Sequence, residues 1–276
     1  MEADVMNQLA PAPGKDQYME AVRVNSALLE DAARLGLTEV VSTCPGWYVA
    51  TLVAHIGEVQ RFWALQIRSR AQEKQDLPRA AFDSCPGLFE WLDGVDAGAP
   101  DLEAVPDGLI TWFERATVEL LAAFQDIDPE EAVWHWSGDN RAIAHMRNQA
   151  MEATVHRWDA QNAYGAVTPV DPIIARDGID QHFEVQIAAA RQWGTPIQGS
   201  GETYHFHRTD GEGEWMVRFE GDGVAVRHQH GTGDVALRGS VEDIFLWLWG
   251  RISGERLDVR GDTSLLDRYR TLVPTS

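Results

Sequence analysis

The chain has 276 residues, of which 44% are hydrophobic and 24% are charged, and its formal net charge is −20. So acidic a chain repels phosphate groups, which disfavours nucleic-acid and anionic-membrane partners. No run of about 18 apolar residues occurs, so no transmembrane helix is expected. Only two cysteines are present, and the N-terminal segment lacks the basic and apolar regions of a signal peptide. We therefore predict a cytoplasmic protein without a disulfide framework.

The first part of the chain carries helical periodicity. Four long helices are predicted, over residues 17–35, 49–70, 107–125 and 141–164. The connection 71–106 is richer in Pro, Gly and Asp and contains a short predicted helix near Leu88–Leu92. Gly165 is a candidate C-cap for the fourth long helix. Helices of this length joined head to tail favour an up-down four-helix bundle, which we expect to occupy a first domain over 1–168.

The pattern changes after the linker 165–172, which contains two prolines. A predicted helix over 172–193 is followed by four predicted strands, over 202–209, 214–221, 223–230 and 234–240. The intervening sequences DGEGE, GDG and GTG are typical of hairpin turns. A helix over 240–252, with Ser240 as its candidate N-cap, precedes one more strand and a short helix. This part of the sequence predicts a small α+β domain over 169–276.

A candidate metal site lies on the fourth predicted helix. Glu152 and His156 are four residues apart, so their side chains leave the same helix face about 6 Å apart along the axis. His55, between Val53 and Ile56 on the second helix, is the candidate third ligand. Two histidines, one carboxylate and an open fourth position are typical of catalytic zinc. Spacing alone favours the plainer interpretation, a solvated Glu–His pair and a core histidine.

Two segments then carry a family resemblance. Residues 44–63 (CPGWYVATLVAHIGEVQRFW) and 147–165 (RNQAMEATVHRWDAQNAYG) resemble the signature segments of the mycothiol-dependent maleylpyruvate isomerase family. The N-terminal domain of that family is a DinB-like metal-binding four-helix bundle. The positions of the family pattern are filled here by Trp47, His55, Glu152, His156, Arg157, Trp158, Asp159 and Ala160. The resemblance implies that His55, Glu152 and His156 ligate a divalent metal, usually zinc.

The resemblance extends to the C-terminal part of the chain. Residues 234–255 (DVALRGSVEDIFLWLWGRISGE) are similar to the second domain of the family, a small α+β unit that resembles sterol-carrier folds. The chain departs from the family pattern at Tyr48, where Thr or Ser would cap the helix, and at Met151, where His often precedes the metal-binding Glu. Because these departures lie near the expected entrance for the substrate, the resemblance does not identify the substrate.

Three further residues lie near the candidate site in sequence. Asp159 follows His156 by three residues and could orient its ring as a hydrogen-bond acceptor; a helix-end salt bridge with Arg157 is the alternative. His145 shares the same helix face and is a candidate general base or substrate contact, unless it is a surface histidine. Arg147 is the candidate cofactor-binding residue, because it could bind a carboxylate at the cavity rim, with a surface position again the alternative.

The C-terminal part offers other candidates. Arg251 ends the LWLWGR helix and matches an arginine that the family contributes to the active site; interaction with the helix C-terminus is the alternative. The pairs His205/His207 and His228/His230 each share one strand face and could bind a metal. No carboxylate or cysteine completes such a site by spacing, so we expect solvated strand faces.

These observations lead to one main functional hypothesis. The metal would bind the sulfur of a low-molecular-weight thiol, mycothiol by the resemblance, and the thiolate would add to an electrophilic small molecule. The product would be an isomer, as from maleylpyruvate to fumarylpyruvate, or a thiol conjugate. Cys44 is not expected to be the nucleophile, because the turn before the second helix lies away from the metal face. The protein would act as a monomer or small homo-oligomer.

Two other functions stay open at this point. In the first, the bundle retains a structural metal and the α+β domain binds an apolar ligand, which would make the protein a binding or regulatory protein. In the second, the protein is a thiol-independent zinc hydrolase that uses metal-bound water, with His145 as its general base.

Overall fold

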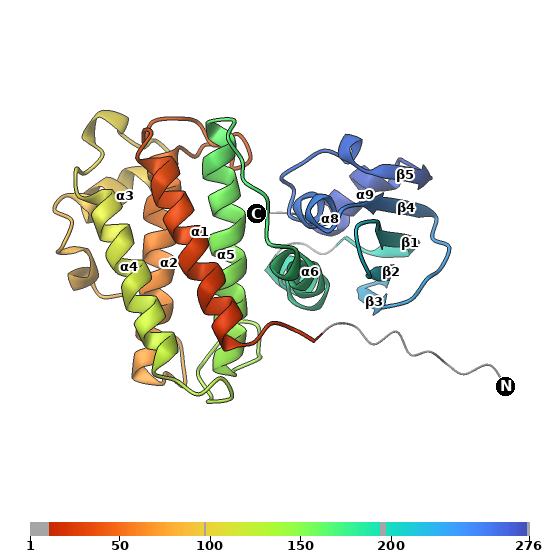
Figure 1. Cartoon of the computed structure of the whole chain (residues 1–276), viewed down its shortest axis with the longest axis horizontal. Coiled ribbons are helices and arrows are strands. Elements are labelled where there is room, and N and C mark those ends of the chain that lie inside the picture. The colour runs from red at the N-terminus through yellow and green to blue at the C-terminus, as the bar shows by residue number, and fades with distance from the viewer. Residues whose placement is uncertain (1–10, 97, 194–196, 275–276) are drawn as a thin grey trace. The chain divides into compact units, whose positions relative to one another are not determined.

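The computed structural model describes residues 11–96, 98–193 and 197–274 (Figure 1). The chain divides into two compact units, Pro13–Pro169 and the part that begins at Val170. The first unit is helical and the second is built on a small mixed sheet, which is the fold class that the sequence predicts. Among the described helices, none is both long enough and apolar enough to cross a membrane.

Four long helices form the bundle of the first unit, with α1 packed mainly against α5 and α2 mainly against α4 (Figure 1). Their bounds are Lys15–Ala33 for α1, Val49–Ser69 for α2, Leu109–Gln125 for α4 and Ala142–Ala163 for α5. The connection between α2 and α4 contains α3 (Leu88–Asp96) and two short 3-10 turns, Arg79–Phe82 and Leu102–Ala104.

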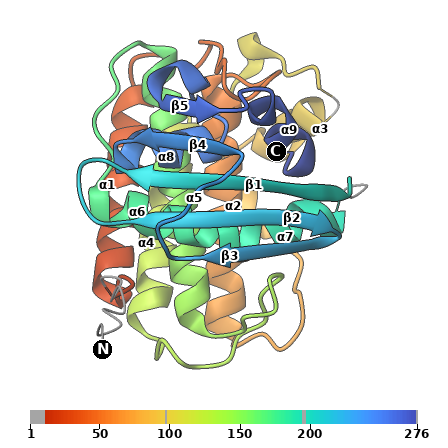
Figure 2. The ribbon, with the colours of Figure 1, turned by 90° about the vertical axis from the view of Figure 1, so that its right-hand side faces the viewer.

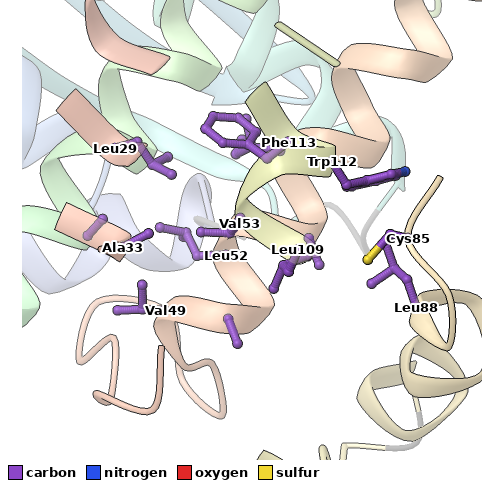
Figure 3. Close-up of a cluster of buried hydrophobic side chains, with 14 of the residues drawn as sticks. Leu29, Ala33, Val49, Leu52, Val53, Cys85, Leu88, Leu109, Trp112 and Phe113 are labelled. Carbon is purple, nitrogen blue, oxygen red and sulfur yellow. The ribbon is translucent and has the colours of Figure 1, made fainter. Parts of the chain in front are cut away.

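The core of the bundle fixes the position of α2. Val49, Leu52 and Val53 project from α2 into a cluster of buried apolar side chains (Figure 3). Burying each such side chain contributes roughly 1.5–3 kcal/mol. A Cβ added to Gly57 would lie 2.2 Å from the Trp112 ring, so only glycine allows α2 and α4 to approach this closely. His55, the candidate metal ligand on α2, lies between Val53 and Gly57 and so belongs to this tightly packed segment.

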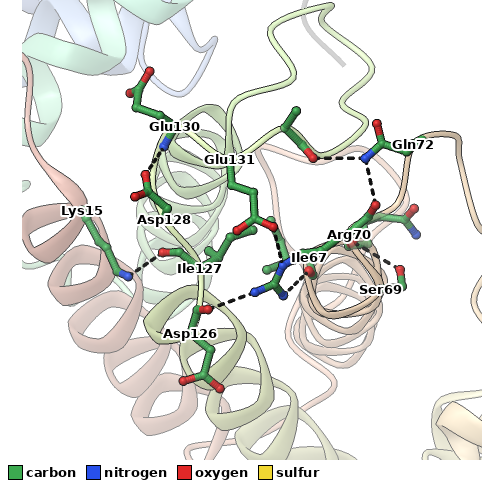
Figure 4. A network of polar contacts seen from close by, with 12 residues as sticks. Lys15, Ile67, Ser69, Arg70, Gln72, Asp126, Ile127, Asp128, Glu130 and Glu131 are labelled. Carbon is green, nitrogen blue, oxygen red and sulfur yellow. Dashed lines mark hydrogen bonds and ion pairs between the residues drawn. The ribbon is translucent and has the colours of Figure 1, made fainter.

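The ends of the helices are closed by local interactions. Tyr48 is the N-cap of α2 and makes no side-chain capping bond, as expected from the missing Ser or Thr. Gly165 follows α5 with a φ of 67°, a left-handed conformation that favours glycine at a helix C-terminus. Arg70 ends α2 with a φ of 50°. Its guanidinium donates to Glu131 Oε1 at 2.8 Å and to the Asp126 carbonyl at 3.0 Å, which ties α2 to the α4–α5 connection (Figure 4).

The second unit begins with a helical segment and continues with a five-stranded sheet of order β3-β2-β1-β4-β5 (Figure 2). The helical segment comprises α6 (Pro172–Gln181), a π-helical turn (His182–Gln186) and α7 (Ile187–Trp193). The strands are β1 (Gly199–Arg208), β2 (Glu214–Gly221), β3 (Gly223–Arg227), β4 (Val235–Gly239) and β5 (Asp258–Gly261). The remaining helices are α8 (Val241–Leu248), a 3-10 turn (Gly254–Arg256) and α9 (Leu265–Leu272).

One of the three predicted hairpin turns is wrong. The DGEGE and GDG sequences join antiparallel neighbours, as predicted. GTG does not form a hairpin, because β4 pairs in parallel with β1 and the connection 228–234 must cross both β2 and β1 (Figure 2). Glycine suits a crossover as well as a turn, since it allows the backbone to pass close to neighbouring strands. Ser240 does cap α8, as predicted, by accepting from the Asp243 N–H at 3.1 Å.

The two faces of the sheet differ in polarity. The buried face carries large apolar side chains that pack against helices: Tyr204, Phe206, Trp215, Val217 and Phe219. Phe206 contacts Trp247 of α8, and Tyr204 contacts Tyr269 of α9. Alternation along β1 and β2 therefore directs His205, His207 and Glu214 to the opposite face.

His182 gives this unit a predicted pH dependence. Its ring is 3% exposed, with Nε2 3.0 Å from the Tyr269 hydroxyl. Burial, and secondarily the charge of Arg270, lower its pKa to about 3. Below about pH 6.5 the unfolded chain protonates this imidazole while the folded chain does not, so acidification favours unfolding. Between pH 7 and 5 this ring should cost about 2 kcal/mol of stability.

Urea unfolding at the two pH values checks this prediction. The His182→Gln variant should be less stable at neutral pH and should lose about 2 kcal/mol less than the parent on acidification. Other buried histidines contribute equally to both proteins, so the difference isolates His182. An identical loss in parent and variant would contradict the prediction.

Candidate metal centre

The structure brings together the three side chains predicted as ligands. His55 projects from α2, and Glu152 and His156 project from adjacent turns of α5. One ligand atom of each lies within 4.8 Å of those of the other two. Glu152 Oε2 is 3.5 Å from His156 Nε2, and the two imidazole centroids are 5.4 Å apart. We call this group the bundle trio.

A buried carboxylate orients one imidazole of the trio. Asp159 is fully buried, and its Oδ2 lies 2.9 Å from His156 Nδ1. Its other oxygen accepts a bond from Thr43 Oγ1 at 2.6 Å. Because Nδ1 is engaged with the carboxylate, Nε2 of His156 is left facing Glu152. This is the arrangement in which a carboxylate fixes the tautomer and the direction of a metal-binding histidine.

The expectation that Cys44 lies away from this face is wrong. Its Sγ is 3.6 Å from Asp159 Oδ2, and the side chain is half-buried. The turn folds back on itself, with the Trp47 N–H bonded to the Cys44 carbonyl at 2.9 Å. Helical periodicity predicts which side chains of α2 share a face. It does not apply to the irregular turn before α2, so it gave no position for the side chain of Cys44. Thr43 and Cys44 both support Asp159, a role that sequence reasoning missed.

The surroundings of the two imidazoles of the trio give them different protonation states in the metal-free protein. Burial opposes protonation of His156, but bonds to Asp159 and Cys44 and the charges of both carboxylates raise its pKa to about 9. Burial, helped by the neighbouring positive charge of His156, lowers the pKa of His55 to about 3, so this imidazole is neutral. Two imidazole nitrogens and one carboxylate are the donor set of catalytic zinc, and binding would displace the proton from His156 Nε2.

Trp47 covers one side of the trio. Its ring stacks on His156 with centroids 6.0 Å apart and meets the ring of His55 at 4.9 Å. The tryptophan of the CPGW turn therefore shields both imidazoles with an apolar surface, which strengthens electrostatic interactions in the site.

A cavity of about 460 Å³ begins at His55. Its apolar wall is made of Val59, Phe62, Leu77, Phe82 and Phe89, and its charged lining residues are Glu58, Lys74 and Asp76. The volume is within the range of small-molecule sites, and the lining combines apolar with charged side chains. Most of the wall comes from the connection 71–106, which has no regular period. Sequence reasoning therefore missed it, although the aromatic residues of this connection were a usable signal.

The other two candidates of α5, His145 and Arg147, lie on earlier turns of the helix than Glu152. His145 is fully buried, with its ring packed against Trp63 and His135 and its Nε2 3.3 Å from the Val133 carbonyl. The alternative of a surface histidine is therefore wrong. The seven residues between His145 and Glu152 correspond to about 10 Å along the helix axis. Arg147 is half-buried, and the geometry of an α-helix places its Cα about 140° around the axis from that of Glu152.

In the C-terminal unit, Arg251 and the pair His205/His207 each contact a polar partner. Arg251 is 8% exposed, and its Nη1 donates to the Trp249 carbonyl at 2.7 Å, so the helix-end interaction is present. The expectation that no carboxylate accompanies His205 and His207 is wrong, because Glu214 Oε2 lies 2.9 Å from His205 Nε2. The contact arises across the first hairpin, which spacing along one strand could not reveal.

Comparisons with known proteins agree with this architecture. Residues 18–161 match the family model described as mycothiol maleylpyruvate isomerase N-terminal domain, and residues 174–268 match the MDMPI C-terminal domain. The chain is similar to the crystal structure of the mycothiol-dependent maleylpyruvate isomerase, with 16% identity, a TM-score of 0.61 and coverage of 91% of this chain and 95% of that one. A histidine-to-alanine mutant of that enzyme gives 15% identity, the same TM-score and the same coverage. No curated protein sequence matches the chain.

Proposed function

The chain belongs to the mycothiol maleylpyruvate isomerase family, and we propose that it is a metal-dependent enzyme that uses a low-molecular-weight thiol to isomerise or conjugate an electrophilic small molecule. The observation that carries the proposal is the convergence of the bundle trio, one member of which, His55, also lines the cavity. Three ligands leave a position on the metal for a sulfur atom, and the cavity leaves room for an acceptor beside it.

His55, Glu152 and His156 would hold the divalent metal, with zinc as the ion that suits their donor set. When bound, zinc supplies a positive charge that favours the thiolate form of a thiol at neutral pH. Asp159 holds the proton on Nδ1 of His156 and keeps the ring directed at the metal position. Trp47 excludes water from one side of the two imidazoles.

The cavity would receive the acceptor. Its aromatic wall can cover the body of a small molecule, while Lys74, whose Nζ lies 3.3 Å from Asp76, offers a positive charge to a carboxylate. From the family resemblance we also propose that Arg251 binds a substrate carboxylate, because a guanidinium can pair with it through two parallel hydrogen bonds.

The two versions of the reaction differ in the fate of the thiol. In the isomerase version the thiolate sulfur forms a bond to one carbon of a cis double bond, and the electron pair moves into the adjacent carbonyl. Rotation about the new single bond and loss of the same thiolate give the trans isomer, so no thiol is consumed. In the transferase version the carbon gains a proton and the carbon–sulfur bond stays. Measuring thiol consumption against product separates the two.

Turnover of maleylpyruvate by the purified protein, with mycothiol and zinc, tests the proposal. We expect activity that requires both thiol and metal and that a chelator removes. Activity without thiol would favour the zinc hydrolase instead; the burial of His145, its candidate base, speaks against that reading. No turnover of this or other cis-enone acids, together with lipid binding that survives a chelator, would favour the binding protein.

A further inference from the structure

The polar face of the C-terminal sheet carries a second group of potential metal ligands. It comprises three imidazoles and one carboxylate, which we call the sheet cluster: His205, His207, Glu214 and His230. One ligand atom of each lies within 4.8 Å of those of the others. The whole cluster belongs to the C-terminal unit, so it is independent of the bundle trio.

Strand register assembles three members of the cluster. His205 and His207 alternate along β1 and therefore share a face. Glu214 opens β2 directly opposite His207 across the hairpin. Its carboxylate reaches both imidazoles, with Oε2 2.9 Å from His205 Nε2 and Oε1 3.1 Å from His207 Nδ1.

The crossover between β3 and β4 supplies the fourth member. His230 Nδ1 lies 2.7 Å from Glu214 Oε2, although its side chain is 80% exposed. A Cβ on Gly231 would lie 3.0 Å from a methionine sulfur of β2, and one on Gly233 would lie 3.0 Å from the backbone of His205. The glycines of the crossover thus let it pass close enough over the sheet to place this imidazole.

We propose that the sheet cluster binds a divalent transition metal, for which zinc is the fitting ion. Zinc binds imidazole nitrogen and carboxylate oxygen at about 2.0–2.2 Å, so ligand atoms in a tetrahedral site lie about 3.3 Å apart. The three contacts to Glu214, from 2.7 to 3.1 Å, are already near that separation. Magnesium and calcium prefer oxygen ligands, which three imidazoles do not provide.

A metal ion here would link β1, β2 and the crossover. Four protein ligands fill a tetrahedral coordination shell, which is typical of structural zinc sites. A surface hollow of about 460 Å³ borders His207 and Glu214 and gives an ion a path from solvent. Because the unfolded chain does not hold these ligands together, bound zinc should stabilise the folded C-terminal unit.

Zinc titration of the metal-free full-length protein tests this site. We would use a His55→Ala background, which weakens the proposed bundle site, and measure zinc binding by calorimetry together with the unfolding temperature. One equivalent of zinc should bind and raise that temperature. Adding His230→Ala should weaken binding at least about tenfold and remove most of the stabilisation. Adding His228→Ala, in the same crossover but outside the cluster, should leave both unchanged.

The Glu214→Gln variant provides a second measurement, because it keeps the side-chain shape but removes the charge; it should also weaken zinc binding at least about tenfold. Circular dichroism identifies any variant that fails to fold. The proposal is overturned if the His55→Ala protein binds no zinc, or if affinity and stabilisation are the same with and without His230→Ala. If wild-type protein loses its zinc through His230→Ala but not through His55→Ala, the sheet cluster stands and the bundle site fails.

Discussion

Replacing His55 with alanine is expected to lower zinc affinity in the helical bundle by at least about 100-fold and to abolish thiol-dependent turnover. Removing a partner that only orients a ligand already costs about 10–100-fold in affinity, and His55 is proposed as a ligand itself. Its low pKa keeps the imidazole neutral, so it offers a lone pair without first releasing a proton. With two ligands left, the position for sulfur is no longer defined.

Zinc affinity by calorimetry and turnover of the same preparations check this result. Both should be measured in a His230→Ala background, so that the sheet cluster does not contribute. Glu58→Gln is the matched control, because Glu58 lies one turn further along α2 and lines the same cavity without belonging to the trio. The control should keep its zinc affinity. A His55→Ala protein with unchanged zinc affinity would contradict the assignment of His55 as a ligand.

The elements of the fold were predictable because their signals are local. Apolar spacing along 49–70 and 141–164 defines helix faces, and a carboxylate and a histidine four residues apart must share one of them. The bundle prediction supplied the candidate on the other helix, His55, and the resemblance supported all three residues as ligands. The order of the strands was not predictable in this way. Nothing within the GTG sequence distinguishes a hairpin from a crossover, because the parallel partner of β4 lies 31 residues earlier in the chain.

The contacts that sequence reasoning missed in the two sites differ in how far they could have been inferred. Thr43 and Cys44 lie in an irregular turn, and their approach to Asp159 spans more than 100 residues of sequence. The contact of Glu214 with His207 could have been inferred, since a hairpin through DGEG fixes which residues face each other. The contact with His230 could not, because it depends on the path of the crossover over the sheet.

The Asp159→Asn variant is expected to bind zinc in the bundle about 10–100-fold more weakly than the parent and to lose turnover in proportion. The amide has nearly the same shape, so the buried position can stay packed. Its nitrogen, however, cannot accept a hydrogen bond, while three donors now point at the carboxylate, from Thr43, Cys44 and His156. At least one of these donors must lose its acceptor, and the ring of His156 loses the negative charge that fixes its direction.

Thr43→Val separates this effect from a general loss of packing. It removes one donor to the same carboxylate and leaves the Asp159–His156 bond in place, so zinc affinity should change only a few-fold. Both variants should show a parent-like circular dichroism spectrum, and zinc affinity should be compared in the His230→Ala background. If Asp159→Asn weakened zinc no more than Thr43→Val, the carboxylate would serve only the packing of the CPGW turn against α5. A much larger loss in Asp159→Asn places Asp159 in control of the direction in which His156 faces the metal.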